Sequence, residues 1–351
     1  MDLLDDVNQG LALRAVRVPW LLAIPGALTV AACVAVCVRL GQPVWGLQLG
    51  MGAFFSGLTA MTDPTARRRP QMLVLGVMIA LGTLLGGYLS PFGYWGVLAL
   101  ALLSLPAGYL AAAGARAATA GTVLLGVFSV NQGLQPQASQ VPVYALLSLA
   151  GSLLMIVVIE GWSLLLRRSP DNASPDEATP IALLREHAHL SDRFVRHALR
   201  LAGAEVVAGL LAHLLGIDHA YWIPLTVAFV LLPNRSGTAS QVIARLMGTM
   251  LGIGLLLAPL TFHPHVGIGT VVAVFLGALL SYAFGPLNYA FAVAGLTITV
   301  LSLDAFIGEP VLTTAPIRSL CTIIAGVICA GVWLAAGPDR RQAASSSSPM
   351  G

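Results

Sequence analysis

Long apolar segments alternate with short polar ones along the whole chain. Apolar runs of about 20 residues recur, and this is the length a helix needs to cross roughly 30 Å of hydrocarbon. Pro and Gly lie inside several of them, as membrane helices tolerate. The pattern predicts an all-α polytopic membrane protein with about twelve transmembrane helices, the second, fifth and eighth being short. The predicted spans lie near 19–40, 44–61, 71–90, 94–114, 117–131, 142–166, 197–217, 221–233, 241–261, 266–284, 286–305 and 314–336.

Composition supports the bilayer as the solvent. The chain has 351 residues, of which 57% are hydrophobic and 9% are charged, whereas a water-soluble domain carries about 25% charged residues. No segment forms a basic patch for nucleic acid, and no P-loop, nucleophile elbow or carboxylate pair is present. We therefore expect no enzyme activity and no cofactor. Four cysteines lie inside apolar spans and are interpreted as small core residues rather than as a disulfide set or a metal site: Cys33, Cys37, Cys321 and Cys329.

The arginines predict the orientation of the chain. All 18 basic residues are arginine, and with the N-terminus inside, sixteen lie on the cytoplasmic side, leaving Arg39 and Arg318 toward the outside. Such an excess of inner positive charge is typical of multi-pass proteins. We expect a bacterial inner-membrane protein with both termini in the cytoplasm.

The second half of the chain repeats features of the first. Trp45 aligns with Trp222 at an offset of 177, and Gly82-Thr83-x-x-Gly86 matches Gly248-Thr249-x-x-Gly252 at an offset of 166. Because each half has an even number of spans, both halves enter the bilayer with the same polarity, which predicts two parallel six-helix repeats. The expected organisation is an N-terminal membrane repeat at 1–166, a cytoplasmic linker with an amphipathic helix at 167–196, a C-terminal membrane repeat at 197–336 and a disordered tail at 337–351.

Two amphipathic helices are expected outside the spans. Residues 2–17 place apolar side chains on one stripe and predict a short interfacial helix before the first span. In the linker, Thr179 followed by Pro180 is a good helix start. We expect the helix that begins there to run on into the seventh span.

Arg245 and Arg318 are the candidate anion ligands. Arg245 lies about four residues into its predicted span, so it is either a topology anchor that snorkels to the inner interface or a guanidinium fork for a carboxylate. Thr249, one helical turn further on, could add a hydroxyl on the same face. Arg318 lies near the outer end of the last span. The two arginines are thus expected near opposite membrane faces, as the inner and outer ends of one anion path.

Two acids within spans are candidates for proton coupling. Glu205 and Glu160 both fall in the predicted cytoplasmic halves of their spans. A buried carboxyl group could load and release a proton, and the alternative is an ion pair, which for Glu205 would be with an inner arginine. Three aromatic residues at outer span ends, Trp45, Tyr221 and Trp222, are interpreted either as an interfacial belt or as stacking partners for an aromatic substrate.

The stretch from Tyr221 to Gly252 resembles the core of the fusaric acid resistance-like family, which includes aromatic acid exporters. The resemblance rests on Tyr-Trp-x-Pro-Leu-Thr at 221–226 and on Arg-x-x-Gly-Thr-x-x-Gly at 245–252. The later Arg318-x-x-x-Thr322-x-x-x-Gly326 is similar to the family's second arginine helix. More distantly, the six-span layout is similar to plant aluminium-activated malate transporters. The resemblance implies inner-membrane efflux of small, often aromatic, organic acids.

The leading functional hypothesis is a secondary transporter that exports small organic anions. The alternatives are a membrane scaffold or assembly partner without flux and an organic-anion channel. Expected partners are the anion and the lipid bilayer, with no nucleic acid, and either a homo-oligomer or a periplasmic adaptor protein could complete the assembly. A transporter predicts a polar, arginine-lined crevice between the halves, and a scaffold predicts sealed apolar packing there.

Overall fold

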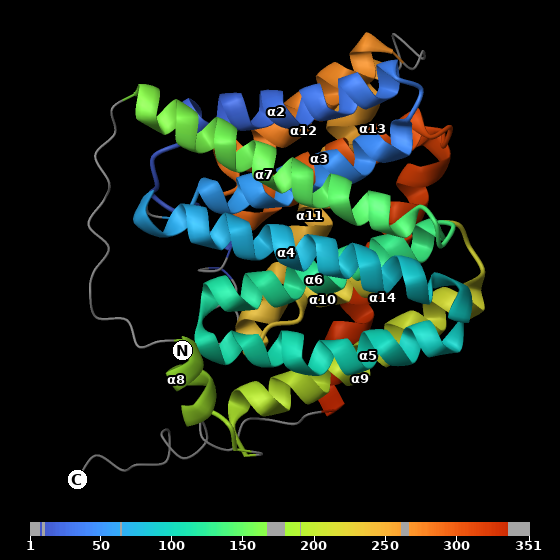
Figure 1. The fold of residues 1–351 in the computed structure, drawn as a ribbon. Coiled ribbons are helices and arrows are strands. Elements are labelled where there is room, and N and C mark those ends of the chain that lie inside the picture. Colours follow the sequence, from blue (N-terminus) through green and yellow to red (C-terminus); the bar gives the residue numbers. More distant parts are fainter. Residues whose placement is uncertain are drawn as a thin grey trace.

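A computed structural model describes residues 8, 11–63, 65–166, 180–189, 191–260 and 267–335 (Figure 1). Within these residues the secondary structure is helical, without strands. The helices are α2 (Trp20–Arg39), α3 (Pro43–Ala60), α4 (Thr65–Leu89), η1 (Ser90–Phe92), α5 (Tyr94–Tyr109), η2 (Leu110–Ala113), α6 (Ala115–Leu134), α7 (Val141–Leu165), α8 (Pro180–Glu186), α9 (Arg193–Leu215), α10 (Trp222–Val230), α11 (Arg235–Leu260), α12 (Ile268–Phe284), α13 (Tyr289–Phe306) and α14 (Val311–Ala335).

The helices are long and apolar, as the hydropathy pattern predicts. Among the described residues, nine helices are long and apolar enough to cross a membrane, and α12 is apolar but shorter, with 17 residues. The helix α10 has only 9 residues, which is about 13 Å and less than half of the hydrocarbon thickness. The prediction of an all-helical, multi-pass membrane protein is confirmed. The number of about twelve crossings stays a prediction.

The start of α11 differs from the sequence-based prediction. The polar stretch after Pro233 was expected to be a loop that lasts until residue 241, but α11 begins at Arg235. The hydroxyl of Thr238 donates to the carbonyl of Asn234 (3.0 Å) and accepts from the backbone N–H of Leu232 (2.9 Å) and from Nε1 of Trp333 (3.1 Å). Because these polar groups find partners within and beside the first turn of the helix, the helix starts six residues earlier than expected.

The linker helix also differs from the sequence-based prediction. It was expected to run unbroken into the seventh span, but α8 ends at Glu186 and α9 begins at Arg193. Asp192 caps α9 by accepting from the N–H of Phe194 (2.8 Å), and its other oxygen pairs with Nδ1 of His187 (2.9 Å). An N-capping aspartate has extended backbone geometry, so it interrupts the helix. The polar linker segment 167–179 lies outside the described residues.

The N-terminal segment is not an interfacial helix throughout its predicted length. Residues 13–19 are non-helical, and most of the residues before them lie outside the described part of the chain. The N–H of Arg14 donates to the carbonyl of Leu287 (2.9 Å), and Nδ2 of Asn288 donates to the carbonyl of Leu11 (2.6 Å). The segment is thus held against the turn between α12 and α13. The tail 337–351, expected to be disordered, lies outside the described residues.

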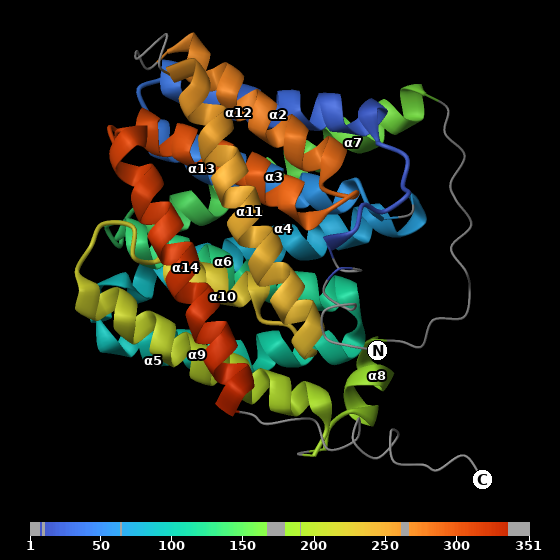
Figure 2. The same cartoon turned by 180° about the vertical axis from the view of Figure 1, so that it is seen from behind.

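The two halves of the chain use corresponding helix contacts. In the first half, α3 packs on α7, and α4 packs on both α6 and α7. In the second half, α10 packs on α14, and α11 packs on both α13 and α14. The halves meet where α5 lies along α9, α12 along α2, and α6 along α10 (Figure 1). From behind, α11 and α14 cross the other helices obliquely (Figure 2).

Glycines allow neighbouring helices to pack closely in both halves. A Cβ atom built on Gly82 or Gly86 of α4 would lie 2.7 Å or 2.3 Å from the carbonyl oxygen of Leu124 or Phe128 in α6. In the second half, a Cβ on Gly248 or Gly252 of α11 would lie 2.4 Å or 2.5 Å from the carbonyl oxygen of Ala290 or Ala294 in α13. The contacted carbonyls are separated by the same 166 residues as the glycines. Small residues of this kind let membrane helices pack backbone to backbone.

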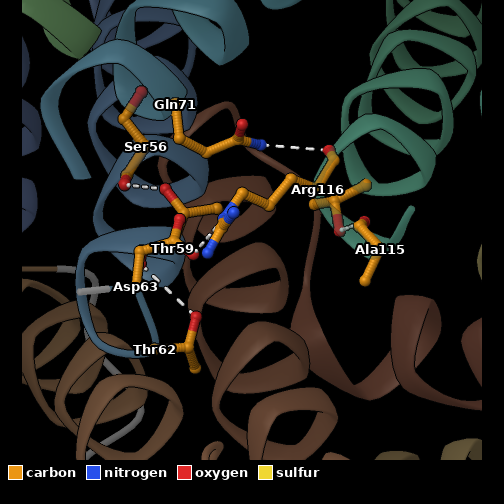
Figure 3. A network of polar contacts seen from close by, with 8 residues as sticks. Ser56, Thr59, Thr62, Asp63, Gln71, Ala115 and Arg116 are labelled. Carbon is orange, nitrogen blue, oxygen red and sulfur yellow. Dashed lines mark hydrogen bonds and ion pairs between the residues drawn. The ribbon is translucent and has the colours of Figure 1, made fainter. Parts of the chain in front are cut away.

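A polar cluster ties together one end of the first half (Figure 3). Nε of Arg116, near the start of α6, pairs with Oδ1 of Asp63 in the α3–α4 turn (2.9 Å). Nε2 of Gln71 in α4 donates to the carbonyl of Arg116 (3.0 Å). These bonds join the α3–α4 turn and the first part of α4 to the start of α6, at the face predicted to be cytoplasmic.

A pair of neighbouring glycines in α11 tests the close packing. We expect Gly252→Ala to lower the free energy of unfolding by about 1–3 kcal/mol, because the added methyl group overlaps a backbone carbonyl that cannot give way. Gly254→Ala is the matched control, since nothing lies within 4 Å of a Cβ there, and better helix propensity should raise stability by up to about 1 kcal/mol. Thermal unfolding in detergent measures both. Equal effects of the two variants would contradict the proposed contact.

Candidate functional site

Arg245 and Arg318 are buried inside a group of four helices formed by α10, α11, α13 and α14. Each side chain is 1% exposed. Arg245 is the eleventh residue of α11, about 15 Å from the start of that helix, and Arg318 is the eighth residue of α14, about 10 Å from its start. Neither lies at a helix end. Of the two alternatives for Arg245, a topology anchor that snorkels does not fit a side chain that is 1% exposed.

Arg245 contacts two aromatic residues, but part of its guanidinium group has no hydrogen-bond partner among the described residues. Its Nη1 donates to the hydroxyl of Tyr289 (2.9 Å), and its Cζ lies 5.3 Å from the ring centroid of Phe229. Nε and Nη2 have no hydrogen-bond partner among the described residues, and neither does the hydroxyl of Thr249, one turn further along the same face. Two guanidinium donors and a hydroxyl are therefore available in the interior.

Arg318 stacks on Trp222. The Cζ atom lies 4.9 Å from the ring centroid, and Nε has no partner among the described residues. Thr322, one turn further on, donates to the carbonyl of Arg318 (2.8 Å). Trp222 is itself fully buried, so it is not part of an interfacial belt, whereas Trp45 at the equivalent position is 38% exposed. The two tryptophans of the repeat thus have different surroundings.

The two arginines act on each other. Arg245 is close enough to Arg318 to influence it electrostatically, although the sequence places the two near opposite membrane faces. Within the described residues, no carboxylate forms an ion pair with either guanidinium. Arginine at mid-membrane costs about 3 kcal/mol on insertion scales, and a buried charge is normally paired. The site therefore has an unbalanced positive charge.

A cavity lies between the two halves next to this charge. The volume open to the centres of water molecules is about 60 Å³, which is enough for a few water molecules. Its walls are mostly apolar and aromatic, and Thr299, Asp304 and Arg318 supply the polar groups. Arg245 does not line it, but Phe229, on which Arg245 stacks, does. The walls comprise Leu47, Gly50, Met51, Phe54 and Phe55 of α3, Val130 of α6, Tyr221, Trp222, Leu225 and Phe229 around α10, Leu296, Thr299, Val300, Leu303 and Asp304 of α13, and Arg318 of α14.

Asp304 was missed by the sequence reasoning. It was interpreted as a charge in an outer loop, but it lies inside α13, is 4% exposed and lines the cavity. Its Oδ2 has no hydrogen-bond partner among the described residues. A usable pattern was present, because Thr297 and Asp304 are seven residues apart and so share one face of an otherwise apolar helix.

A histidine stacks on one of the residues that line the cavity. His219, in the loop between α9 and α10, stacks on Trp222 with the ring centroids 4.6 Å apart, and its Nδ1 lies 3.2 Å from the hydroxyl of Tyr221. Burial lowers the pKa of His219 from its ordinary value, against the smaller opposing effect of nearby acids. The ring is therefore neutral near pH 7 and adds no charge to the site.

The two acids expected to couple protons lie outside this cavity. Glu205 is fully buried in α9, and neither of its carboxylate oxygens has a partner among the described residues. The expected ion pair with an inner arginine is not formed, and the residue acts electrostatically on Cys329 of α14 instead. Glu160 in α7 is partly exposed, with Oε1 lacking a partner. Neither acid lines the cavity.

The first half has a polar cluster at the corresponding place, but it is neutral and closed. Nε2 of Gln48 donates to Oδ1 of Asn131 (2.7 Å), and Oγ of Ser148 donates to Oε1 of Gln48 (3.1 Å). Thr83 donates to the carbonyl of Ile79 (2.9 Å) and lies 3.4 Å from both Ser148 and Asn131. Thr83 aligns with Thr249 in the repeat that the sequence predicts. This cluster therefore satisfies its polar groups internally, whereas among the described residues the group around Arg245 and Thr249 does not.

Comparison with known proteins gives a match in the second half. Residues 207–332 match the family model described as "Fusaric acid resistance protein-like". The chain is 31% identical over 152 residues to "Inner membrane protein YccS" of Escherichia coli (strain K12), which is 43% of this chain and 20% of that protein. It is 32% identical over 143 residues to "Uncharacterized protein ORF2" of Neisseria gonorrhoeae, which is 40% of this chain and 34% of that protein.

The matched length limits what the relatives show. The chain spans between a fifth and about a third of the length of these relatives. No solved structure matches it. The matched region 207–332 contains Arg245, Asp304 and Arg318, so the unbalanced cluster lies in the part of the chain shared with the family, whereas Glu205 precedes that part.

Equivalent threonines test the contrast between the two polar clusters. We expect Thr83→Val to lower the free energy of unfolding by about 0.5–1.5 kcal/mol, because its hydrogen bonds are lost and Asn131 loses a partner. Thr249→Val should change stability by less than about 0.5 kcal/mol, since its hydroxyl makes no bond that could be lost. Unfolding in detergent measures both variants. A Thr249 variant as destabilised as the Thr83 variant would show that the second cluster is also closed.

Proposed function

We propose that this chain, whose residues 207–332 place it in the fusaric acid resistance protein-like family of membrane proteins, is a secondary transporter of small organic anions that exports aromatic acids. The bacterial inner membrane is the proposed location, in line with the name of the Escherichia coli relative. The arginine distribution supports an orientation with both termini in the cytoplasm.

The observation that carries the proposal is the guanidinium of Arg318 at the wall of an aromatic cavity. A guanidinium offers a planar fork that binds a carboxylate with charge-assisted hydrogen bonds, and Nε of Arg318 has no partner. Phe54, Phe55 and Trp222 provide aromatic walls for a substrate ring. An aromatic carboxylate would satisfy both the charge and the apolar surface of the site.

Arg245 supports the same function from behind the cavity wall. Its guanidinium stacks on Phe229 and adds positive potential without reaching the cavity surface. Because a low-dielectric interior screens charge weakly, this potential acts on an anion beside Arg318. Tyr221 adds its ring to the cavity wall, and Thr249 stays with Arg245 behind that wall. Trp45, being exposed and outside the cavity, fits an interfacial role.

Transport further requires that the halves move. The cavity has room for a few water molecules only, so a substrate would enter when the halves separate. Two parallel repeats are our proposal for the moving parts, supported by the corresponding helix contacts and by the glycine contacts that recur at an offset of 166. The contacts of α2 with α12 and of α5 with α9 would then be the hinge or sliding surfaces.

The alternatives predict a different interior. A scaffold without flux favours sealed apolar packing between the halves. The cavity there is mostly apolar, and the two charged residues at its wall, Asp304 and Arg318, are what favours transport over a scaffold. An organic-anion channel would use the same Arg318 but would conduct without saturation. Flux of radiolabelled benzoate into proteoliposomes distinguishes the two, because a transporter saturates with substrate and a channel passes current in proportion to the driving force.

Substitution of Arg318 tests the proposed function. We expect Arg318→Gln to weaken benzoate binding to the purified protein by about 10- to 100-fold, the loss of a charge-assisted hydrogen-bond pair. Isothermal titration in nanodiscs gives the affinity. Arg39→Gln is the matched control, since Arg39 is exposed at the end of α2 and the variant should bind as the wild type does. A folded Arg318 variant with unchanged affinity would refute the assignment.

A further inference from the structure

Asp304 and Arg318 face the same cavity with opposite charges but are not paired. Each acts electrostatically on the other, yet they form no ion pair, and Oδ2 of Asp304 and Nε of Arg318 lack hydrogen-bond partners among the described residues. A carboxylate so placed reduces the positive potential that a substrate carboxylate would meet. It also repels that substrate directly.

We propose that Asp304 is a proton-binding site of this cavity, and that its protonation and the binding of an organic anion at Arg318 favour each other. This inference rests on the proposed function. When Asp304 takes a proton from water, its negative charge is removed and the cavity keeps the full charge of Arg318. When an anion binds first, its charge raises the affinity of Asp304 for a proton by the same factor, because coupling between two sites is reciprocal.

The other groups around Asp304 do not offer the same coupling. On α14 it faces Arg318, and on the α10 side it faces Tyr221 with His219 in the loop before it. Glu309, in the segment after α13, is the nearest further acid. Across the cavity, α3 and α6 contribute apolar lining residues. Arg245 and Tyr289 lie toward the other end of α11 and α13, and α12 carries no charged residue.

Glu205 is the competing candidate, and its position disfavours it. Both of its carboxylate oxygens lack a hydrogen-bond partner among the described residues, as Oδ2 of Asp304 does, but Glu205 does not line the cavity. A proton on Glu205 would therefore change the potential at Arg318 less than a proton on Asp304 would, since the interaction falls with distance. The two acids make a matched pair for substitution.

The experiment measures benzoate binding by the full chain in nanodiscs between pH 5.5 and 7.5, the range in which benzoate stays ionised. For the wild type we expect the affinity to rise as the pH falls, by at most tenfold per pH unit for one coupled proton. Addition of benzoate to weakly buffered protein should also draw in up to one proton per bound anion, detected with a pH indicator. This second measurement needs no variant.

Substitutions identify the residue that takes up the proton. Asp304→Asn imitates the neutral acid, so we expect it to bind benzoate at all pH values at least as tightly as the wild type does at pH 5.5, without proton uptake. Glu205→Gln should keep both the pH dependence and the uptake. If Asp304→Asn keeps them, or if Glu205→Gln or His219→Gln removes them, the inference is overturned.

The outcomes also separate this inference from the proposed function. Absence of benzoate binding by the wild type would remove both. Binding that depends on Arg318 but draws in no proton would leave the proposed function standing and overturn the role of Asp304.

Discussion

Two guanidinium groups lie in the apolar interior of the second half, and no carboxylate of the described residues pairs with them. The proposed function depends on this electrostatic imbalance. Arg245 has one hydrogen bond, to Tyr289, and Arg318 rests on the face of Trp222. Aromatic faces attract a cation but do not neutralise it. A chain that keeps such a charge in a membrane bears a cost in stability that packing alone does not explain. Under the proposed function, a bound substrate anion would balance this buried positive charge.

The comparison of the two halves supports this interpretation. Gln48, Thr83, Asn131 and Ser148 form a closed set of hydrogen bonds in the first half. At the position of Thr83, the second half has Thr249 with an unpartnered hydroxyl, beside two arginines. Similar backbones therefore hold a polar cluster that is complete in one half and incomplete in the other. We interpret the first half as the rigid partner and the second as the half that binds the ligand.

The sequence was sufficient for the helices and for the identity of the arginines, but not for their depth. Apolar periodicity and small-residue motifs are local features, so the helical segments and the role of Gly248 and Gly252 followed from them. The start of α11 did not, because Thr238 satisfies its polar groups inside a helix in a stretch that has the composition of a loop. The cavity was missed for another reason: it arises where α3 and α13 meet, and such a contact leaves no periodic pattern in the chain. Asp304 could have been found from its seven-residue spacing to Thr297.

The most direct test of the account is to locate a bound anion. A structure of the protein with para-bromobenzoate can be solved by crystallography, with the bromine found by its anomalous scattering. The account predicts the carboxylate within hydrogen-bond distance of Arg318 and the bromine among Phe54, Phe55 and Phe229. Bromine density only at the lipid-facing surface, with the Arg318 guanidinium turned away from the cavity, would contradict it.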